Sequence, residues 1–82
     1  MDYRIEFSQT AKKELNELEK DTAIRILKKL REIVKQPFTH IKRLSGSQLF
    51  SLRVGDYRIL MIVIEDKILV TRLGHRKNVY DS

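Results

Sequence analysis

The spacing of apolar residues changes in kind at Pro37, and this change constrains the fold more than any other feature of the sequence. Before Pro37, two stretches carry apolar residues at intervals of three and four, the period of an amphipathic helix. After Pro37, apolar residues alternate with polar ones or form a short run, as they do in strands. An alternating stretch, "YRIEF" at 3–7, also precedes the helical stretches and predicts an initial strand.

Two helices are predicted between this strand and Pro37. The first begins at Ser8, whose hydroxyl suits an N-cap, and the second is capped in the same way by Asp21. Proline cannot continue a helix, so the second helix ends before Pro37. The apolar stripes are formed by Ala11, Leu15 and Leu18 in the first helix, and by Ile24, Leu27, Leu30 and Val34 in the second, widened by Ile26 and Ile33.

The remainder of the chain is predicted to form three strands after a loop at 38–47. The strands span 49–54, 57–64 and 68–73, joined by turns at "GD" and "EDK". The resulting β-α-α-β-β-β order predicts an α+β fold, a small, largely antiparallel sheet with two N-terminal helices packed on one face. With 82 residues, we expect a single domain over residues 1–82, since a second core would not fit.

The turn at Gly55-Asp56 fixes the register of the first hairpin. A two-residue loop places Arg53 directly opposite Arg58. The apolar residues of the first hairpin strand, which should face the helices, are Phe50, Leu52 and Val54. Because side chains alternate between faces, both arginines then lie side by side on the open face. They either extend into water, pair with Asp56, or hold a phosphate between two guanidinium groups.

The charge of the chain favours a polyanionic partner. Seventeen Lys and Arg against eleven Asp and Glu give a net charge of +6, which suits nucleic acid or an acidic protein segment. There is no cysteine, so disulfides and thiolate metal sites are excluded and a cytoplasmic location is expected. We expect no association with a membrane, because the sequence has no signal-peptide pattern and no apolar run of spanning length.

The segment "GHRKNVY" at 74–80 follows the last strand and carries further candidate site residues. His75, Arg76 and Tyr80 could converge from there on the arginine pair. Alternatively, His75 is a strand-end histidine that bonds to backbone, and Tyr80 is an aromatic lid on the sheet. His40 has no Asp, Glu or Cys cluster near it in sequence, so no metal site is expected.

Together, "RVGDYRILMIV" and "RLGHRKNVY", behind two amphipathic helices, resemble the RelE/ParE superfamily of toxin–antitoxin toxins, and most closely its RelE branch. The resemblance covers nearly the whole chain and implies a RelE-like sheet related to that of microbial ribonucleases. It implies a stress-response toxin that inhibits translation as an mRNA interferase, cleaving mRNA in the ribosomal A site. It also implies a cognate acidic, RelB-like antitoxin, with operator DNA bound only through the toxin–antitoxin complex.

The resemblance also assigns roles to particular residues. Arg58 and Arg76 match family arginines that steady the scissile phosphate. Tyr80 matches a tyrosine that stacks on the substrate nucleotide and assists proton transfer. The chain departs from the pattern on the first hairpin strand. Some RelE proteins place lysines there, one of them a candidate general base, where this chain has Leu49 and Ser51.

Metal-independent RNA cleavage needs a base for the ribose 2'-OH, an acid for the leaving 5'-oxygen, and cations for the phosphate. Arg58 and Arg76 can supply cations. His75 is the candidate for proton transfer, because histidine changes charge near neutral pH, with Tyr80 as the other donor or acceptor. No cofactor is required.

Arg53, Arg72 and Lys77 are the remaining RNA-binding candidates. The side on which Arg72 lies depends on the turn before the last strand. A two-residue turn at Glu65-Asp66 puts Arg72 on the helix side, and a three-residue turn through Lys67 puts it on the open face.

Two functions compete with that of a ribonuclease. One is a ParE-like inhibitor of DNA gyrase, which would use the same fold for a protein contact and needs no nuclease site. The other is a catalytically weak family member that mainly binds its antitoxin. The presence of Leu49 and Ser51, where some RelE proteins have lysines, is the feature that raises the possibility of a catalytically weak member.

Overall fold

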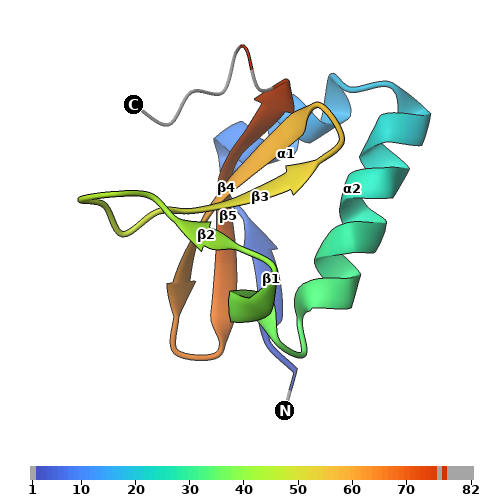
Figure 1. The fold of residues 1–82 in the computed structure, drawn as a ribbon. Coiled ribbons are helices and arrows are strands. Elements are labelled where there is room, and N and C mark those ends of the chain that lie inside the picture. Colours follow the sequence, from blue (N-terminus) through green and yellow to red (C-terminus); the bar gives the residue numbers. More distant parts are fainter. Residues whose placement is uncertain (1, 76, 78–82) are drawn as a thin grey trace.

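The structure is a computed structural model that describes residues 2–75 and residue 77. Its elements are β1 (Arg4–Phe7), α1 (Gln9–Asn16), α2 (Lys20–Ile33), a 3-10 turn (Pro37–Thr39), β2 (Lys42–Arg43), β3 (Phe50–Val54), β4 (Tyr57–Ile64) and β5 (Lys67–His75) (Figure 1). The prediction of a loop at 38–47 was therefore incomplete, because it missed β2. Within the described residues, no helix is long and apolar enough to cross a bilayer.

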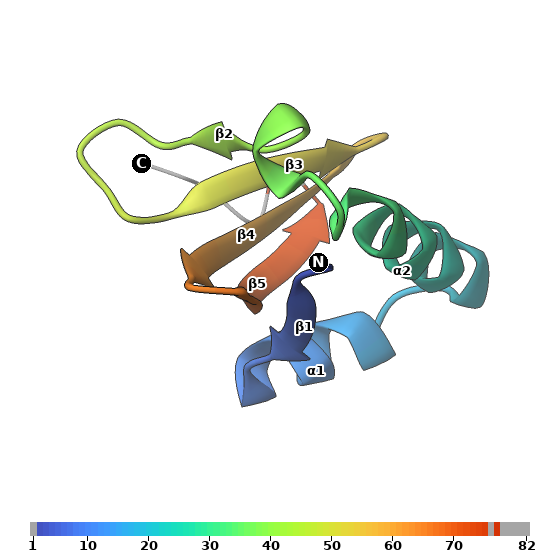
Figure 2. The ribbon, with the colours of Figure 1, turned by 90° about the horizontal axis from the view of Figure 1, so that it is seen from below.

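The five strands form one sheet in the order β1-β5-β4-β3-β2. β1 runs parallel to β5, and the other neighbouring strands are antiparallel. Figure 2 shows both helices on the same side of this twisted sheet. The predicted α+β fold, with a largely antiparallel sheet and both helices on one face, is confirmed.

The two helix starts differ in how well the sequence predicted them. Ser8 caps α1 as predicted, because its Oγ accepts a hydrogen bond of 3.0 Å from the backbone N–H of Ala11. The prediction of Asp21 as a cap was wrong. The N-cap of α2 is Glu19, which makes no capping bond with its side chain, and Asp21 lies in the first turn. A carboxylate there still interacts favourably with the positive end of the helix dipole.

The buried face of α2 is rotated from the predicted stripe. Ile26, Leu30 and Ile33 are buried, whereas Ile24 is 51% exposed and Leu27 is 39% exposed. Both sets have helical spacing, so periodicity alone could not choose between them. The core joins Ala11, Ile26, Leu30 and Ile33 to Leu52, Ile59, Met61, Ile68, Val70 and Leu73 of the sheet.

A β-bulge in β5 determines which face of the sheet the side chains after Thr71 occupy. Ile64 pairs with Lys67, so the turn has two residues, yet Met61 pairs with Val70 while Leu60 pairs with Arg72. Thr71 is thus an extra residue, and extra residues shift the alternation of side chains beyond them. Arg72 therefore shares a face with Leu60, the open face, although turn length alone placed it on the helix side.

Ser8 fastens this bulge to the start of α1. Its Oγ donates a hydrogen bond of 2.8 Å to the carbonyl of Thr71, and its N–H donates one of 2.9 Å to the carbonyl of Val70. The Thr71 hydroxyl donates in turn to the carbonyl of Leu60 at 3.2 Å. One serine side chain thus both caps α1 and satisfies the carbonyl of the bulged residue.

Replacing Ser8 by Ala should lower the free energy of unfolding by about 1–2 kcal/mol, through loss of the helix cap and of the bond to Thr71. Urea denaturation followed by circular dichroism measures this change. Thr10→Ala is the matched control, since Thr10 is exposed in the first turn of α1. Equal stability of the two variants would contradict the role given to Ser8.

Candidate functional site

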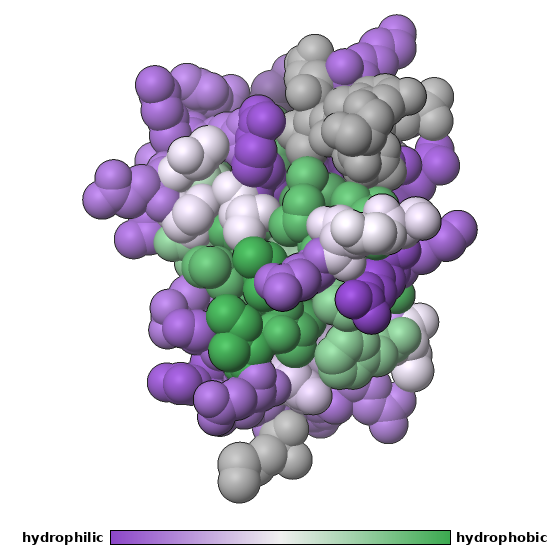
Figure 3. All heavy atoms as spheres, turned by 90° about the vertical axis from the view of Figure 1, so that its left-hand side faces the viewer, coloured by the Kyte–Doolittle hydropathy of each residue, from purple (hydrophilic) through white to green (hydrophobic). Residues whose placement is uncertain are grey.

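The open face of the sheet carries a basic cleft of about 460 Å³. The residues that line it are His40, Lys42, Arg43, Leu44, Ser45, Ser51, Arg53 and Arg58. No Asp or Glu is among these lining residues of the described chain. Figure 3 looks onto this side of the molecule, where hydrophilic side chains surround a hydrophobic area. Ile62 and its cross-strand neighbour Leu69 belong to the same face of the sheet as Leu60.

The strand register arranges the open face, in and beside the cleft, in two rows. Residues that pair directly across antiparallel strands have side chains on the same face. The first row contains Arg53, Arg58 and Gly74, and the second contains Lys42, Ser51, Leu60 and Arg72. Successive rows on one face are about 7 Å apart along the strands. The predicted pairing of Arg53 with Arg58 is confirmed.

The two arginines of the first row are held differently. Arg53 is exposed, and its Nε donates a hydrogen bond of 3.0 Å to the carbonyl of Gly55 at the turn. Its two terminal amino groups remain as donors for a ligand. Arg58 is half-buried, with its Nε enclosed by protein. Gly74, the partner of Arg58 on β5, has no side chain to project over it.

His75 lies on the other side of the sheet from this arginine pair. It is opposite Tyr57, whose ring packs against the core, and the two rings meet edge to face with centroids 5.6 Å apart. Its Nδ1 accepts a hydrogen bond of 3.2 Å from the backbone N–H of Lys77. The structure thus does not bring His75 to Arg58, and the backbone bond matches the alternative reading of a strand-end histidine.

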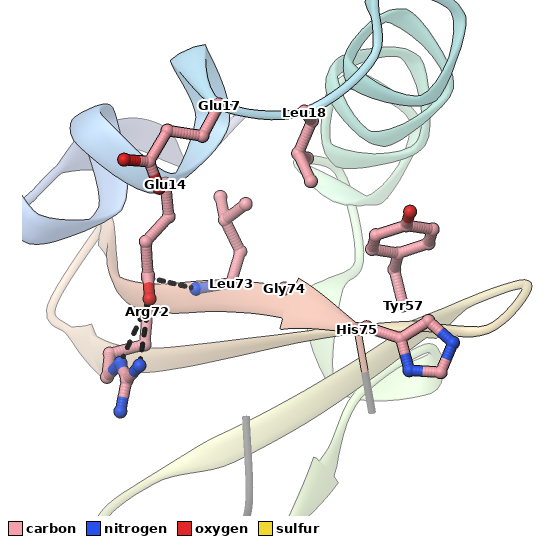
Figure 4. A pocket seen from close by; sticks show the side chains of 8 residues that line it. All are labelled: Glu14, Glu17, Leu18, Tyr57, Arg72, Leu73, Gly74 and His75. Atoms are coloured by element: carbon pink, nitrogen blue, oxygen red, sulfur yellow. Dashed lines mark hydrogen bonds and ion pairs between the residues drawn. The ribbon is translucent and has the colours of Figure 1, made fainter. Parts of the chain in front are cut away.

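A second pocket, of about 350 Å³, surrounds His75 (Figure 4). Glu14, Glu17 and Leu18 line one side of it, and Tyr57, Arg72, Leu73, Gly74 and His75 line the other. Two carboxylates at its wall oppose the binding of a phosphate. The pocket is therefore a poorer candidate for an RNA site than the basic cleft.

Glu14 closes the edge of β5 beyond the end of β1. Its Oε1 accepts a hydrogen bond of 2.9 Å from the N–H of Leu73, and its Oε2 accepts bonds from Arg72 at 2.8 and 3.3 Å (Figure 4). The hydrogen bond and the charge of Glu14 raise the pKa of Arg72 above its ordinary value. Arg72 is thus already engaged by a carboxylate, and its contact with RNA stays a prediction.

Sequence reasoning missed the contribution of β2 to the cleft. Lys42 pairs with Ser51, and Arg43 pairs with Phe50 while its Nε donates a bond of 3.0 Å to the carbonyl of Ser47. A strand of two residues is too short to show a period. The available signal was the pair of bases framed by Ile41 and Leu44, directly before a Ser-Gly-Ser turn.

The structure says little about the positions of three other predicted site residues. Arg76 and Tyr80 lie outside the described residues, and Lys77 is exposed. Their roles stay predictions. In the described part of the chain, no group of three or more His, Cys, Asp or Glu side chains could hold a metal ion.

Sequence comparison decides the family. A model of the ParE toxin of type II toxin–antitoxin systems matches residues 5–80. The chain belongs to the RelE/ParE toxin superfamily. This RelE-like protein is thus the toxin component of a type II toxin–antitoxin system, and the family expected from the sequence is confirmed. A search of curated proteins found no match.

Solved structures of toxin–antitoxin complexes share the fold of this RelE-like toxin. RelBE2 of Mycobacterium tuberculosis is 23% identical, with a TM-score of 0.83, over 93% of this chain and 100% of that chain. RelB–RelE of Methanococcus jannaschii is 29% identical, with a TM-score of 0.74, over 93% and 95% of the two chains. The ParDE system of Pseudomonas aeruginosa is 11% identical, with a TM-score of 0.68, over 89% and 95%.

Removing Glu14 should destabilise the toxin chiefly through the N–H of Leu73. Glu14→Ala leaves this partly buried donor without its acceptor, which costs about 1–3 kcal/mol, whereas Glu14→Gln keeps an acceptor oxygen. Coupling to Arg72, an exposed ion pair, should contribute no more than about 1 kcal/mol. A double-mutant cycle with Arg72→Ala, measured by urea denaturation, separates the two contributions.

Glu17→Ala is the matched control, because Glu17 lines the same pocket one helical turn away. If Glu17→Ala and Glu14→Ala were equally stable, the carboxylate of Glu14 would not secure the edge of β5.

Proposed function

We propose that this toxin is a metal-independent endoribonuclease that cleaves mRNA in the ribosomal A site and thereby inhibits translation. The observation that carries the proposal is the pairing of Arg53 with Arg58 in a cleft lined by basic residues and by no described carboxylate. Such a cleft attracts a phosphate chain, and two guanidinium groups suit its oxygens. We infer that residues 1–82 form a single toxin domain.

RNA cleavage requires positive charge beside the reacting phosphate, and the basic residues of the cleft can supply it. The ribose 2'-oxygen attacks the adjacent phosphorus, and negative charge grows on the non-bridging oxygens in the transition state. Arg58 and Arg53 would stabilise that charge, which is the largest single contribution in many enzymes. Arg76 and Tyr80 complete the proposal from the terminal segment, as a further phosphate ligand and as a stacking platform for the nucleotide.

Gyrase inhibition is the second candidate function, because the matching family model is that of a ParE toxin. Two observations favour the ribonuclease. The RelE complexes named above have higher TM-scores with this chain than the ParDE system does. A basic cleft also suits RNA better than it suits a contact with a protein. Primer extension on mRNA and a DNA supercoiling assay distinguish the two targets.

Arg58→Ala should abolish mRNA cleavage, and Arg53→Ala should weaken it, with a loss of about 10²–10³-fold for the stronger effect. Primer extension on mRNA from programmed ribosomes measures the cleavage. Arg31→Ala is the control, since Arg31 is exposed on α2, away from the cleft. An Arg58→Ala toxin that folds normally by circular dichroism and cleaves at the wild-type rate would refute the phosphate role.

We also propose an acidic, largely disordered antitoxin as the partner. The similar structures are complexes with antitoxins, and the net charge of +6 favours an acidic one. Two neighbouring hollows on α2 offer a partly apolar docking surface for it. A hollow of about 280 Å³ between β1 and α2 adjoins one of about 360 Å³, and both are lined by Leu27 and Arg31. Ile24, Leu27 and Phe7 supply apolar surface, and Lys28 and Arg31 supply positive charge. An amphipathic acidic segment complements both.

Ile24→Asp combined with Leu27→Asp should weaken antitoxin binding by at least tenfold, because each exposed apolar side chain contributes on the order of 1–2 kcal/mol when covered. Both residues are exposed, so the fold should persist. Titration calorimetry with the cognate antitoxin measures the affinity. Ile64→Asp, on the exposed end of β4, is the control. Unchanged affinity in the α2 variant would place the antitoxin elsewhere.

A further inference from the structure

The cleft contains few groups that can transfer a proton. Arginine stays protonated in proteins, so Arg43, Arg53 and Arg58 can only supply charge and hydrogen bonds. The strand β3 contains no lysine, and Ser51 on it and Leu49 just before it supply no strong proton donor. Serine hydroxyl groups are weak acids, and leucine has no proton to give. Of the described lining residues, His40 and Lys42 remain.

Lys42 lies on β2, directly across from Ser51 of β3. It pairs directly with Ser51, so its side chain projects from the same face of the sheet, one strand further along the same row. The Ser51 side chain is short and leaves the space above it to its neighbour. The flexible four-carbon stem of Lys42 can reach over Ser51 toward the row that holds Arg53 and Arg58.

Other contacts leave Lys42 available for this role. It is exposed, and within the described residues it forms no ion pair. Its neighbour Arg43 also lines the cleft, but its Nε is bonded to the carbonyl of Ser47. β2 is paired to β3 at both of its residues, which fixes the backbone that carries Lys42. Among its described lining residues, the cleft thus has one lysine, carried by a paired strand, beside three arginines.

We propose that Lys42 of β2 is the catalytic proton donor of this toxin. The assignment rests on the proposed ribonuclease function. The 2'-oxygen forms a bond to phosphorus while its proton passes to solvent water. The bond from phosphorus to the 5'-oxygen breaks, and the Lys42 ammonium gives one proton to that oxygen. The products are a 2',3'-cyclic phosphate and a 5'-hydroxyl group, and Lys42 regains its proton from water.

The experiment compares Lys42→Ala, Lys42→Arg and Arg58→Ala toxins on ribosomes programmed with two mRNAs. The first has the natural 5'-oxygen at the cleavage site, and the second has sulfur in its place. A thiolate leaves without help from an acid, because thiols are much more acidic than alcohols. Lys20→Ala is the matched control, since Lys20 is an exposed lysine at the start of α2.

We expect Lys42→Ala to cleave the natural mRNA about 10²-fold or more slowly, the range of general acid catalysis, and the sulfur-substituted mRNA at the wild-type rate. Lys42→Arg should behave in the same way, because it restores the charge without an acid. Arg58→Ala should be slow on both mRNAs, and Lys20→Ala should be unaffected. Binding to the ribosome should be unchanged in Lys42→Arg and Lys20→Ala, which keep every positive charge of the cleft.

Three results would overturn the assignment. Lys42→Ala could cleave natural mRNA as fast as Lys20→Ala does, which would leave the ribonuclease function standing without this residue. Lys42→Ala could remain slow on the sulfur-substituted mRNA, or Lys42→Arg could restore the rate, and either result would make Lys42 a phosphate ligand instead. A wild-type toxin that cleaves neither mRNA would refute the proposed function itself. His40→Ala serves as the comparison for the other proton-carrying residue of the cleft.

Discussion

The β-bulge at Thr71 determines which face of the sheet each residue of the last strand occupies. Before it, Ile68 and Val70 face the helices, and after it Leu73 does, one position out of the original phase. Without the extra residue, strict alternation would turn Leu73 to the open face and Arg72 toward the core. A charged group would then be buried, and the glycine beside Arg58 would be replaced in the row by a larger side chain.

The contacts that hold the bulge come from the beginning of the chain. Ser8 binds the carbonyl groups around Thr71, and Glu14, further along α1, binds Leu73 and Arg72. β1 pairs with β5 only as far as Val70. Beyond that point, the side chain of Glu14 in α1 accepts the hydrogen bond from the N–H of Leu73 that a neighbouring strand would otherwise accept. An open strand edge is otherwise a site for unwanted pairing. Which residues of β5 lie on the open face thus depends on contacts that β5 makes with the start of α1 and with Glu14.

The described ion pairs lie outside the basic cleft. Described acids pair with bases away from the cleft, as Glu14 does with Arg72, Glu6 with Lys67, and Asp66 with Arg4. These exposed pairs add little stability. The cleft itself contains four of the 17 Lys and Arg residues, and no described carboxylate lines it.

Patterns that act over a few residues were readable from the sequence, and those that depend on tertiary packing were not. The two-residue turn at Gly55-Asp56 fixed the pairing of Arg53 with Arg58, because loop length determines hairpin register. The facing of His75 could not be predicted, because it depends on a bulge that no local pattern signals. Lys42 was missed because β2 is formed by pairing with β3 and not by its own periodicity.

The claim that RNA is bound and cut on the open face can be tested most directly by locating the RNA on the protein. Amide chemical shifts would be measured by NMR during titration with a short RNA whose 2'-hydroxyl at the cleavage site is methylated, so that it binds without reacting. The largest changes are predicted at Lys42, Ser51, Arg53 and Arg58, with little change at Glu17 or Tyr57. Changes confined to the pocket around His75, or to the exposed side of α2, would contradict the account.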